Sequence, residues 1–457
     1  MKRINNNDKF INLRRKFDFF EYQSYKFYQS DNKIIIEFSF NISNEFFFKP
    51  KLEIELQKSA YQINNIPDLS NIVFNLGMIE LISYWKTTCP SKIIIRPHSL
   101  NRDQVEWWKK LYFNGLGEYF YLNNIDTTES EFVEVLSEGE ETKIYDFTLN
   151  YNKVIVPIGG GKDSVVSLEI LRQSDFEVSP MMVNPGAASK RTVETAGFSF
   201  DDSLIVKRFL DPKLIEMNAE GYLNGHTPFS ALLAFTNVLL SLLSGIGNIA
   251  LSNENSANES TVPGTNINHQ YSKSFEFERD FDTYVKKYLH AGINYFSFLR
   301  PLNELQIARL FSGFSKHYKS FRSCNVGSKK DEWCGSCPKC LFTFVILSPF
   351  INQETLIGIF NKNLFNDMSL KPILMELTGI ADIKPFECVG TVSEVNAALA
   401  NYKMSNSDGG SEAALLYDKG YNNLNEPEKI EDILSEFNME NNLPHGFLSI
   451  LKSALYD

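Results

Sequence analysis

The chain has 457 residues, 43% of them hydrophobic, which is enough for two or three domains with a sizeable core. Its formal net charge of −11 at pH 7 disfavours a nucleic-acid substrate, because such substrates are normally bound by basic surfaces. The first nine residues are polar and contain no apolar run, so we expect no signal peptide and a soluble, cytoplasmic protein.

The N-terminal third predicts a small α+β domain. Alternating polar and apolar residues at 33–40 and 51–56 predict two strands. A helix around residues 76–88, a strand at 92–96 and a helix at 103–111 follow, and we expect the domain to span residues 1–145. The acidic stretch 126–142 has no basic residue and is interpreted as a linker or an exposed helix.

Residues 150–345 predict the core of the protein. Strands are expected at 153–158, 177–183, 203–207 and 247–252, with helices between them. This alternation predicts an α/β fold with a doubly wound parallel sheet, which binds ligands at the carboxyl ends of its strands. Residues 346–457 are predicted to form a helical C-terminal region, with a flexible link at 406–411.

One stretch of the core, residues 227–252, carries no formal charge and resembles a membrane span. Asn237, Ser241 and Gly245 interrupt it, and its continuously apolar part is short. We interpret it as a buried helix, a glycine turn and a short buried strand, and expect no membrane insertion.

A glycine-rich loop follows the first core strand. Gly159, Gly160 and Gly161 lie between that strand and apolar residues at helical spacing, and a glycine turn at a helix N-terminus is suited to bind an anion. A Walker A loop is excluded, because Val156 and Asp163 occupy the positions of its first glycine and its Ser or Thr. A dinucleotide-binding loop lacks its third glycine here. A glycine turn without a ligand is the alternative.

The segment 159–164 is similar to the pyrophosphate loop of the N-type ATP pyrophosphatases, Ser-Gly-Gly-x-Asp-Ser, with Gly159 in place of the first serine. The resemblance implies a core like that of the adenine nucleotide alpha hydrolases. It also implies cleavage of ATP between the α and β phosphates, with transfer of the adenylate to an oxygen of the substrate.

Four of the six cysteines form a C-x9-C-x2-C-x2-C cluster: Cys324, Cys334, Cys337 and Cys340. Four thiolates at such spacing can surround a tetrahedral Zn²⁺ and leave no open position for a substrate. The sequence therefore predicts a structural zinc site. Reduced structural cysteines and a redox pair are the alternatives, since disulfides are disfavoured in the cytosol.

Other segments place reactive side chains close to the predicted ends of strands or beside prolines. They contain Asn224 and His226, Asn253 and Glu254, His269 and Lys273, Arg300, and Cys388. Histidine suits proton transfer near neutral pH, arginine can clamp a carboxylate or phosphate, and cysteine is reactive when its pKa is lowered. Each has a structural alternative: a helix cap at Thr227, an ordinary polar loop, a structural histidine, an ion pair between Arg300 and Glu304, or a buried inert thiol.

Taken together, these motifs resemble those of the ATP-dependent UDP-N-acetylmuramoyl-L-alanyl-L-glutamate epimerases of bacterial cell-wall synthesis. The resemblance rests on an ordered series of segments at 157–164, 223–228, 251–259, 268–274, 295–305, 323–325, 333–340 and 384–390. It implies conversion of the terminal L-glutamate of the UDP-linked dipeptide to D-glutamate, with ATP cleaved to AMP and pyrophosphate. Adenylation of the α-carboxylate removes the charge that makes its Cα proton so weakly acidic, so no pyridoxal cofactor is required.

The resemblance also implies roles for the candidate residues. Gly159, Gly160, Gly161 and Ser164 are expected to hold pyrophosphate, Lys162 to neutralise its charge, Asp163 to help bind Mg²⁺, and Asn184 to contact adenine. Glu254, His226, His269 and Cys388 are the candidates for proton transfer. Lys273 and Arg300, with Asn224 and Asn253, are expected to bind the glutamate carboxylates or the UDP diphosphate.

Two other functions stay open at this point. A 7-cyano-7-deazaguanine synthase or tRNA-modifying enzyme also combines a pyrophosphate loop with clustered cysteines, although the acidic charge disfavours tRNA. A nucleotide-binding sensor that does not cleave ATP is the second.

Overall fold

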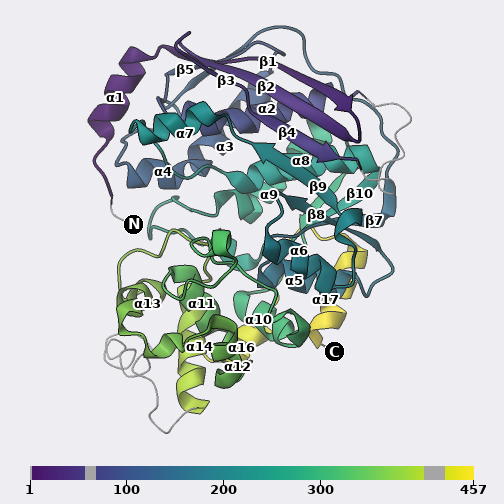
Figure 1. Ribbon diagram of the computed structural model, residues 1–457, viewed down its shortest axis with the longest axis vertical. Helices are drawn as coiled ribbons and strands as arrows, with labels where there is room; N and C mark the ends of the chain where they lie inside the picture. The colour runs from purple at the N-terminus through teal and green to yellow at the C-terminus, as the bar shows by residue number, and fades with distance from the viewer. Residues whose placement is uncertain (1–2, 57–67, 406–427, 457) are drawn as a thin grey trace.

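The computed structural model describes residues 3–56, 68–405 and 428–456. Its strands form one mixed sheet of eleven strands (Figure 1), in the order β11-β10-β7-β8-β9-β4-β2-β1-β5-β6, with β3 beside β2. The strands are β1 (Phe19–Ser30), β2 (Lys33–Ile42), β3 (Phe46–Phe48), β4 (Lys51–Glu55), β5 (Lys92–Ile95), β6 (Glu134–Ser137), β7 (Asn150–Pro157), β8 (Glu177–Val183), β9 (Leu204–Phe209), β10 (Ile246–Leu251) and β11 (Asn294–Ser297).

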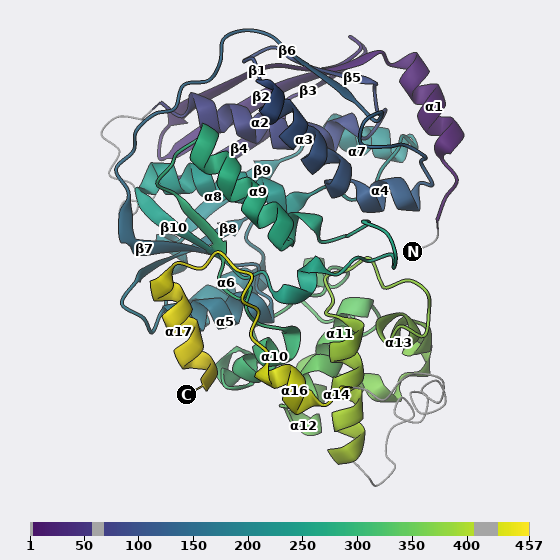
Figure 2. The same cartoon turned by 180° about the vertical axis from the view of Figure 1, so that it is seen from behind.

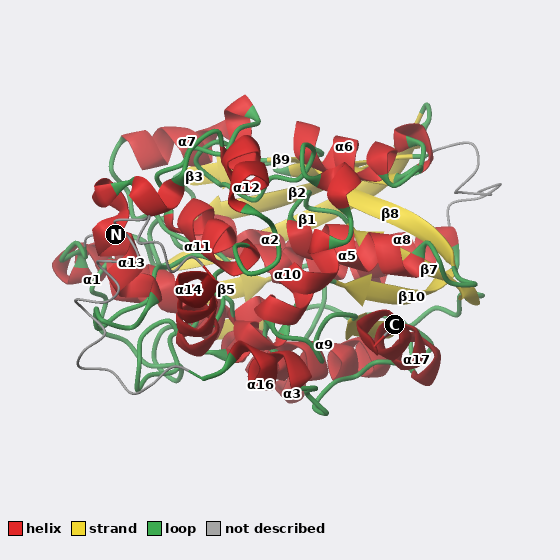
Figure 3. Ribbon diagram, turned by 90° about the horizontal axis from the view of Figure 1, so that it is seen from below, coloured by secondary structure: helices red, strands yellow, loops and turns green. Residues whose placement is uncertain are grey.

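The five strands β11, β10, β7, β8 and β9 are parallel to one another, as expected for the core. Side chains alternate across this part of the sheet: Val154 and Val156 belong to the hydrophobic core on one face, and Ile155 belongs to the core on the other. Figure 3 shows helices on both sides of the strands. The predicted α/β class is confirmed, within a sheet that is larger and more mixed than expected.

The N-terminal strands continue the same sheet. β9 pairs antiparallel with β4, which connects it to β2 and β1, and β5 and β6 follow in parallel at the far edge. The sheet therefore has no break at residue 145, and the limits 1–145, 150–345 and 346–457 stay a prediction.

Four strands differ from the sequence-based expectation. β6 lies inside the acidic stretch 126–142, where we predicted a linker or an exposed helix. Its neighbours Phe132 and Val133 and its own Val135 are buried, so period-two burial outweighs the acidic composition. β1, β3 and β11 were not predicted.

Helices cover both faces of the sheet and form the C-terminal region. They are α1 (Asn7–Lys16), α2 (Ser70–Trp85), α3 (Arg102–Gly115), α4 (Gly117–Leu122), α5 (Lys162–Leu171), α6 (Ala187–Thr195), α7 (Pro212–Ala219), α8 (Phe229–Ser244), α9 (Phe275–Tyr288), α10 (Glu304–Ser312), α11 (Pro338–Leu347), α12 (Gln353–Phe360), α13 (Lys371–Leu377), α14 (Val392–Ser405), α16 (Ile430–Ser435) and α17 (His445–Tyr456). Short 3-10 helices are η1 (Phe200–Asp202), η2 (Asn255–Asn258), η3 (Tyr271–Lys273), η4 (Ser315–His317), η5 (Ser328–Lys330), η6 (Leu364–Asn366) and η7 (Met368–Leu370).

The C-terminal region is helical, as predicted, and extends below the sheet in the view of Figure 1. Its last helix, α17, returns to the parallel strands and packs on α5 (Figure 2). The predicted link at 406–411 lies outside the described residues.

The uncharged stretch 227–252 folds as predicted into a buried helix, α8, a turn and a buried strand, β10. Gly245 makes the turn with φ +64°, a left-handed conformation that favours glycine at the end of a helix. None of the helices in the described ranges is long and apolar enough to cross a membrane.

Candidate active site

The glycine loop joins the carboxyl end of β7 to α5, whose first turn carries Lys162, Asp163 and Ser164. Gly160 has φ +88°, and a Cβ there would lie 2.7 Å from the backbone nitrogen of Ser189, so this position requires glycine. A Cβ at Gly159 would meet nothing within 4 Å. The position that holds serine in the pyrophosphate loop therefore has room for one in this chain.

Hydrogen bonds fix the shape of this loop. The backbone N–H of Arg322 donates to the carbonyl of Gly160 at 2.8 Å. The Ser164 hydroxyl accepts from the N–H of Gly160 at 3.3 Å and donates to the carbonyl of Gly161 at 3.0 Å. The loop is therefore held in place by hydrogen bonds from the protein itself.

A buried charge cluster lies directly behind the loop. The Lys162 ammonium is buried and pairs with the carboxylates of Asp163 and Glu304, the first residue of α10. Burial raises the pKa of Glu304 to about 8, because the negative charges of Asp163 and Glu254 add to the effect of burial and outweigh the attraction of Lys162. Glu304 was predicted only as a partner of Arg300, and it faces Lys162 instead.

A cavity of about 230 Å³ opens at the carboxyl ends of β7, β8 and β10. Gly159, Asp163 and Ser164 line it on the loop side. Asn253 and Lys273 line it too, so the fold brings two predicted substrate-binding residues to the glycine loop.

Lys273 connects this cavity to a thiol and an imidazole. Its ammonium donates to Sγ of the half-buried Cys388 at 3.1 Å, and Cys388 also hydrogen-bonds to His269. Burial opposes ionisation of the thiol, but the charges of Lys273, His269 and Lys339 outweigh it and lower the pKa of Cys388 to about 5. The thiol is therefore a thiolate at neutral pH.

Glu118 of α4 holds His269 from the other side, with Oε2 2.5 Å from Nδ1. Burial alone would lower the pKa of His269, but its hydrogen bonds to Cys388 and Glu118 raise that pKa to about 9. Thiolate, imidazolium and carboxylate thus form a continuous chain of hydrogen bonds. Glu118 was not predicted, because nothing in its local sequence separates it from an ordinary helical glutamate.

His226 lies against this chain. Its ring centroid is 4.5 Å from that of His269, and its Nδ1 is 3.7 Å from Oε2 of Glu118. Burial and the positive charge of His269 lower the pKa of His226 to about 4, so it is neutral at pH 7. The donor atoms of these three residues are as close as those of a metal site. The charges of Lys86 and Lys273 also act on His226, however, and they favour an anion over a metal cation.

Arg300 does not face the cavity. Its side chain is fully buried, and its guanidinium donates to Glu278 Oε2 at 3.1 Å and to the backbone carbonyls of Glu254 and Lys273 at 2.6 and 2.5 Å. This placement favours a structural role over the predicted clamp on substrate.

Three other candidates have side-chain contacts that are local or structural. The Asn184 side chain accepts from the backbone N–H of Arg208 at 2.8 Å and donates to its carbonyl at 3.1 Å, which ties β8 to β9. Asn224 is exposed, and its side chain accepts from the next backbone N–H. Glu254 is buried, with Oε1 3.2 Å from the Ser256 hydroxyl, and its charge acts on Glu304 and Lys273.

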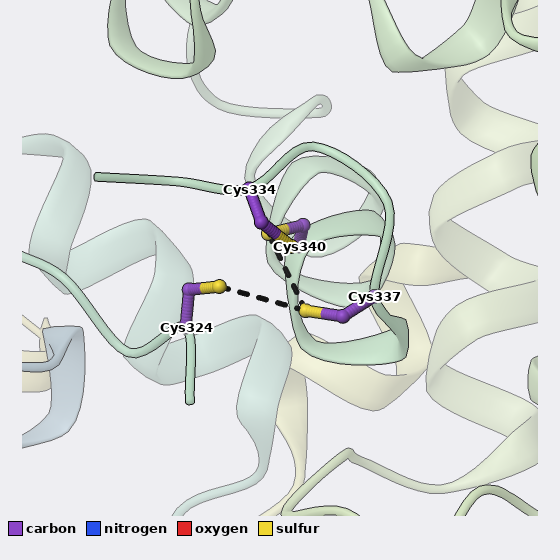
Figure 4. A group of neighbouring side chains, drawn as sticks. All are labelled: Cys324, Cys334, Cys337 and Cys340. Atoms are coloured by element: carbon purple, nitrogen blue, oxygen red, sulfur yellow. Dashed lines mark hydrogen bonds between the residues drawn. The ribbon is translucent and has the colours of Figure 1, made fainter. Parts of the chain in front are cut away.

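The four clustered cysteines converge on one point (Figure 4). Neighbouring Sγ atoms are 3.7 Å apart for Cys324 and Cys337, 3.7 Å for Cys334 and Cys340, and 3.5 Å for Cys337 and Cys340, and none forms a disulfide. Sulfur atoms that bind a tetrahedral zinc at about 2.3 Å lie about 3.8 Å from one another. The donor set fits zinc.

The cysteine cluster also contacts the site. Lys339, between Cys337 and Cys340, donates to the backbone carbonyl of Cys388. On the other side, Arg322 bonds to the glycine loop, and a Cβ at Gly161 would lie 3.3 Å from Cβ of Ser323. The cluster therefore braces both the loop and the segment that carries Cys388.

Family comparisons agree with this arrangement. Residues 12–298 match the MurL N-terminal domain, and residues 319–426 match the MurL C-terminal domain. Three similar proteins are each named UDP-N-acetyl-alpha-D-muramoyl-L-alanyl-L-glutamate epimerase.

The protein from Salinispora tropica is 34% identical over 84% of this chain and 85% of its own length. The protein from Xanthomonas oryzae pv. oryzae is 35% identical over 71% and 73%. The one from a Micromonospora species is 31% identical over 84% and 87%. The chain therefore belongs to the UDP-N-acetyl-alpha-D-muramoyl-L-alanyl-L-glutamate epimerase family.

Proposed function

We propose that this protein is an ATP-dependent epimerase, which converts the terminal L-glutamate of UDP-N-acetylmuramoyl-L-alanyl-L-glutamate to D-glutamate and releases AMP and pyrophosphate. The observation that carries the proposal is the position of Lys273, which lines the cavity of the glycine loop and contacts the Cys388–His269 pair. The glycine loop, which would activate a carboxylate, therefore lies next to the groups that would move a proton. The names of the three relatives support the substrate.

ATP would supply the adenylate that removes the charge of the α-carboxylate. The backbone N–H groups of the loop and of the first turn of α5 suit its phosphates. Asp163, which stays ionised because Lys162 and Lys339 overcome the effect of burial on its pKa, is the group to help hold Mg²⁺. Asn253, on the cavity wall, is the candidate to orient the substrate.

The Cα proton is exchanged by the histidine pair. His269 is held by Glu118 in a fixed orientation, and His226 is the neutral imidazole beside it. The ammonium groups of Lys273 and Lys339 bind the carboxylates of the glutamyl residue, which carries two negative charges before it is activated. The charge of Glu254 acts on Lys273, so we assign Glu254 to stabilising that ammonium rather than to proton transfer.

A structural Zn²⁺ completes the proposal. Cys324, Cys334, Cys337 and Cys340 would hold it, and their spacing leaves no open position for chemistry. The ion would keep Lys339 and the backbone of Arg322 against the reacting groups.

The test is an incubation of the protein with ATP, Mg²⁺ and the UDP-linked L-Ala-L-Glu dipeptide. Formation of AMP and of D-glutamate after acid hydrolysis, both abolished in Asp163→Ala, is the expected result. AMP without D-glutamate would contradict the substrate, and no AMP would contradict the adenylation. The relatives favour this function over the 7-cyano-7-deazaguanine synthase, tRNA-modifying and sensor alternatives.

A further inference from the structure

We infer that Cys388 is a covalent nucleophile, which takes the glutamyl group from its adenylate as a thioester, and that the Cα proton is exchanged on this thioester. The inference rests on the proposed function. It differs from a role for Cys388 as a proton carrier, because it predicts a bond between the enzyme and the substrate.

Cys388 lies close to the residues of the glycine-loop cavity. Lys273 lines the glycine-loop cavity together with Asp163, and the same ammonium lies 3.1 Å from Sγ of Cys388. Lys339 is within electrostatic range of both Asp163 and Cys388. The two lysines therefore connect the thiol to the carboxylate of the loop, where an acyl adenylate would form.

The residues around the thiol are arranged as in a covalent acyl-transfer site. Cys388 hydrogen-bonds to His269, and His269 Nδ1 lies 2.5 Å from Oε2 of the buried Glu118. A nucleophile, a base and a group that orients the base in one hydrogen-bonded line are the parts of covalent acyl-transfer sites.

The Cys388 thiolate has the reactivity that a covalent nucleophile needs. The thiolate, not the thiol, attacks carbon, and neighbouring cations keep Cys388 in that form. A thiolate whose pKa is about 5 is a weak acceptor for a carbon-bound proton and a good leaving group. Both properties suit a transient thioester, which must form from the adenylate and later be hydrolysed.

The steps balance without an oxidant or reductant. The thiolate attacks the acyl carbon of the glutamyl adenylate, a C–S bond forms, the C–O bond to AMP breaks, and AMP leaves with the electron pair. The thioester carries no charge at sulfur, so one cause of the raised pKa of His269 disappears and the imidazolium can release its proton. The Cα proton is then removed and returned. Water finally attacks the thioester, the C–S bond breaks, and the thiolate, the epimerised carboxylate and two protons result.

The experiment uses the full-length protein in excess over a dipeptide labelled with ¹⁴C in its glutamate, with ATP and Mg²⁺, quenched in acid over a time course. We expect label that is bound covalently to the protein, rises and decays during turnover, is released by neutral hydroxylamine, and maps by mass spectrometry to the peptide containing Cys388. Cys388→Ala is expected to lose this label and the formation of D-glutamate.

Dipeptide-dependent exchange of labelled pyrophosphate into ATP serves as the control for folding and adenylation, and we expect Cys388→Ala to retain it. Three results would overturn the inference: D-glutamate formed by the wild type without any covalent label, label that persists in Cys388→Ala, or D-glutamate formed by that variant. If the wild type shows no exchange, the proposed function itself fails, and the thioester fails with it.

Discussion

Replacing Arg300 by methionine tests the conclusion that this arginine is structural. Its guanidinium is fully buried and pairs with Glu278, whose side chain is only 2% exposed. Removing one partner of a buried ion pair leaves an uncompensated charge and costs about 3–5 kcal/mol. The backbone carbonyls of Glu254 and Lys273 would also lose a charged donor, which adds to the loss. We expect Arg300→Met to destabilise the protein by about 4 kcal/mol or more.

The matched control removes the orphaned charge as well. In Arg300→Met/Glu278→Leu both partners are apolar, and we expect part of the stability to return, because the two effects are coupled. Urea unfolding followed by tryptophan fluorescence measures both variants against wild type and the single Glu278→Leu variant. If Arg300→Met unfolds at the wild-type urea concentration while the KM for the dipeptide rises, Arg300 binds substrate and the structural argument is wrong.

Three further predictions concern the loop, the histidine pair and the cysteine cluster. Gly159→Ser is expected to fold normally and to lower the KM for ATP, since a Cβ at this position meets no atom within 4 Å. Gly160→Ala is expected to lose activity, because Gly160 has a φ of +88°. Steady-state kinetics of the two variants checks both expectations. The pKa of His269 is raised to about 9 in the folded protein. Its contribution to the free energy of unfolding is therefore complete below about pH 6.5 and is lost as the pH rises towards 9. Glu118→Gln lowers that pKa, and thermal denaturation between pH 6 and 10 is expected to show a weaker decline with pH in the variant; an unchanged profile would contradict the pairing. Cys324→Ser is expected to reduce both bound zinc, measured by elemental analysis, and dipeptide-dependent pyrophosphate exchange, whereas full zinc content in the variant would contradict the four-cysteine site.

The core strands were predictable because each of them contains consecutive apolar residues. β7, β8, β9 and β10 are short apolar runs flanked by turn residues, as expected for strands covered on both faces. β11 has only four residues, which are too few to show the alternation of a strand, and the residue that follows it in sequence is also aromatic. β1 alternates aromatic and polar residues over part of its length, and this pattern is typical of a strand.

The glycine loop was also predictable, because its glycines, lysine, aspartate and serine are consecutive in the sequence. Their spacing alone indicates an anion-binding loop. The thiol and imidazole were recognised as reactive types, but their grouping was not. Cys388 and His269 are far apart in the sequence and meet only through the fold. The contacts of Arg300 and Asn184 could not be predicted, because their partners, Glu278 and Arg208, are not adjacent to them in sequence.

The continuous sheet connects the two parts of the molecule that the proposed mechanism requires. In the proposed mechanism, a carboxylate is activated by the loop and its charges, which come from β7, α5 and α10. Exchange of a proton also requires a base that is held in one orientation, and that constraint comes from Glu118 on α4, outside the parallel strands. The thiol comes from the other direction, from the C-terminal region that the cysteine cluster ties to the loop. Because β4 and β9 join the N-terminal strands to the core sheet, α4 is fixed relative to the loop, and the imidazole is aligned before any substrate binds.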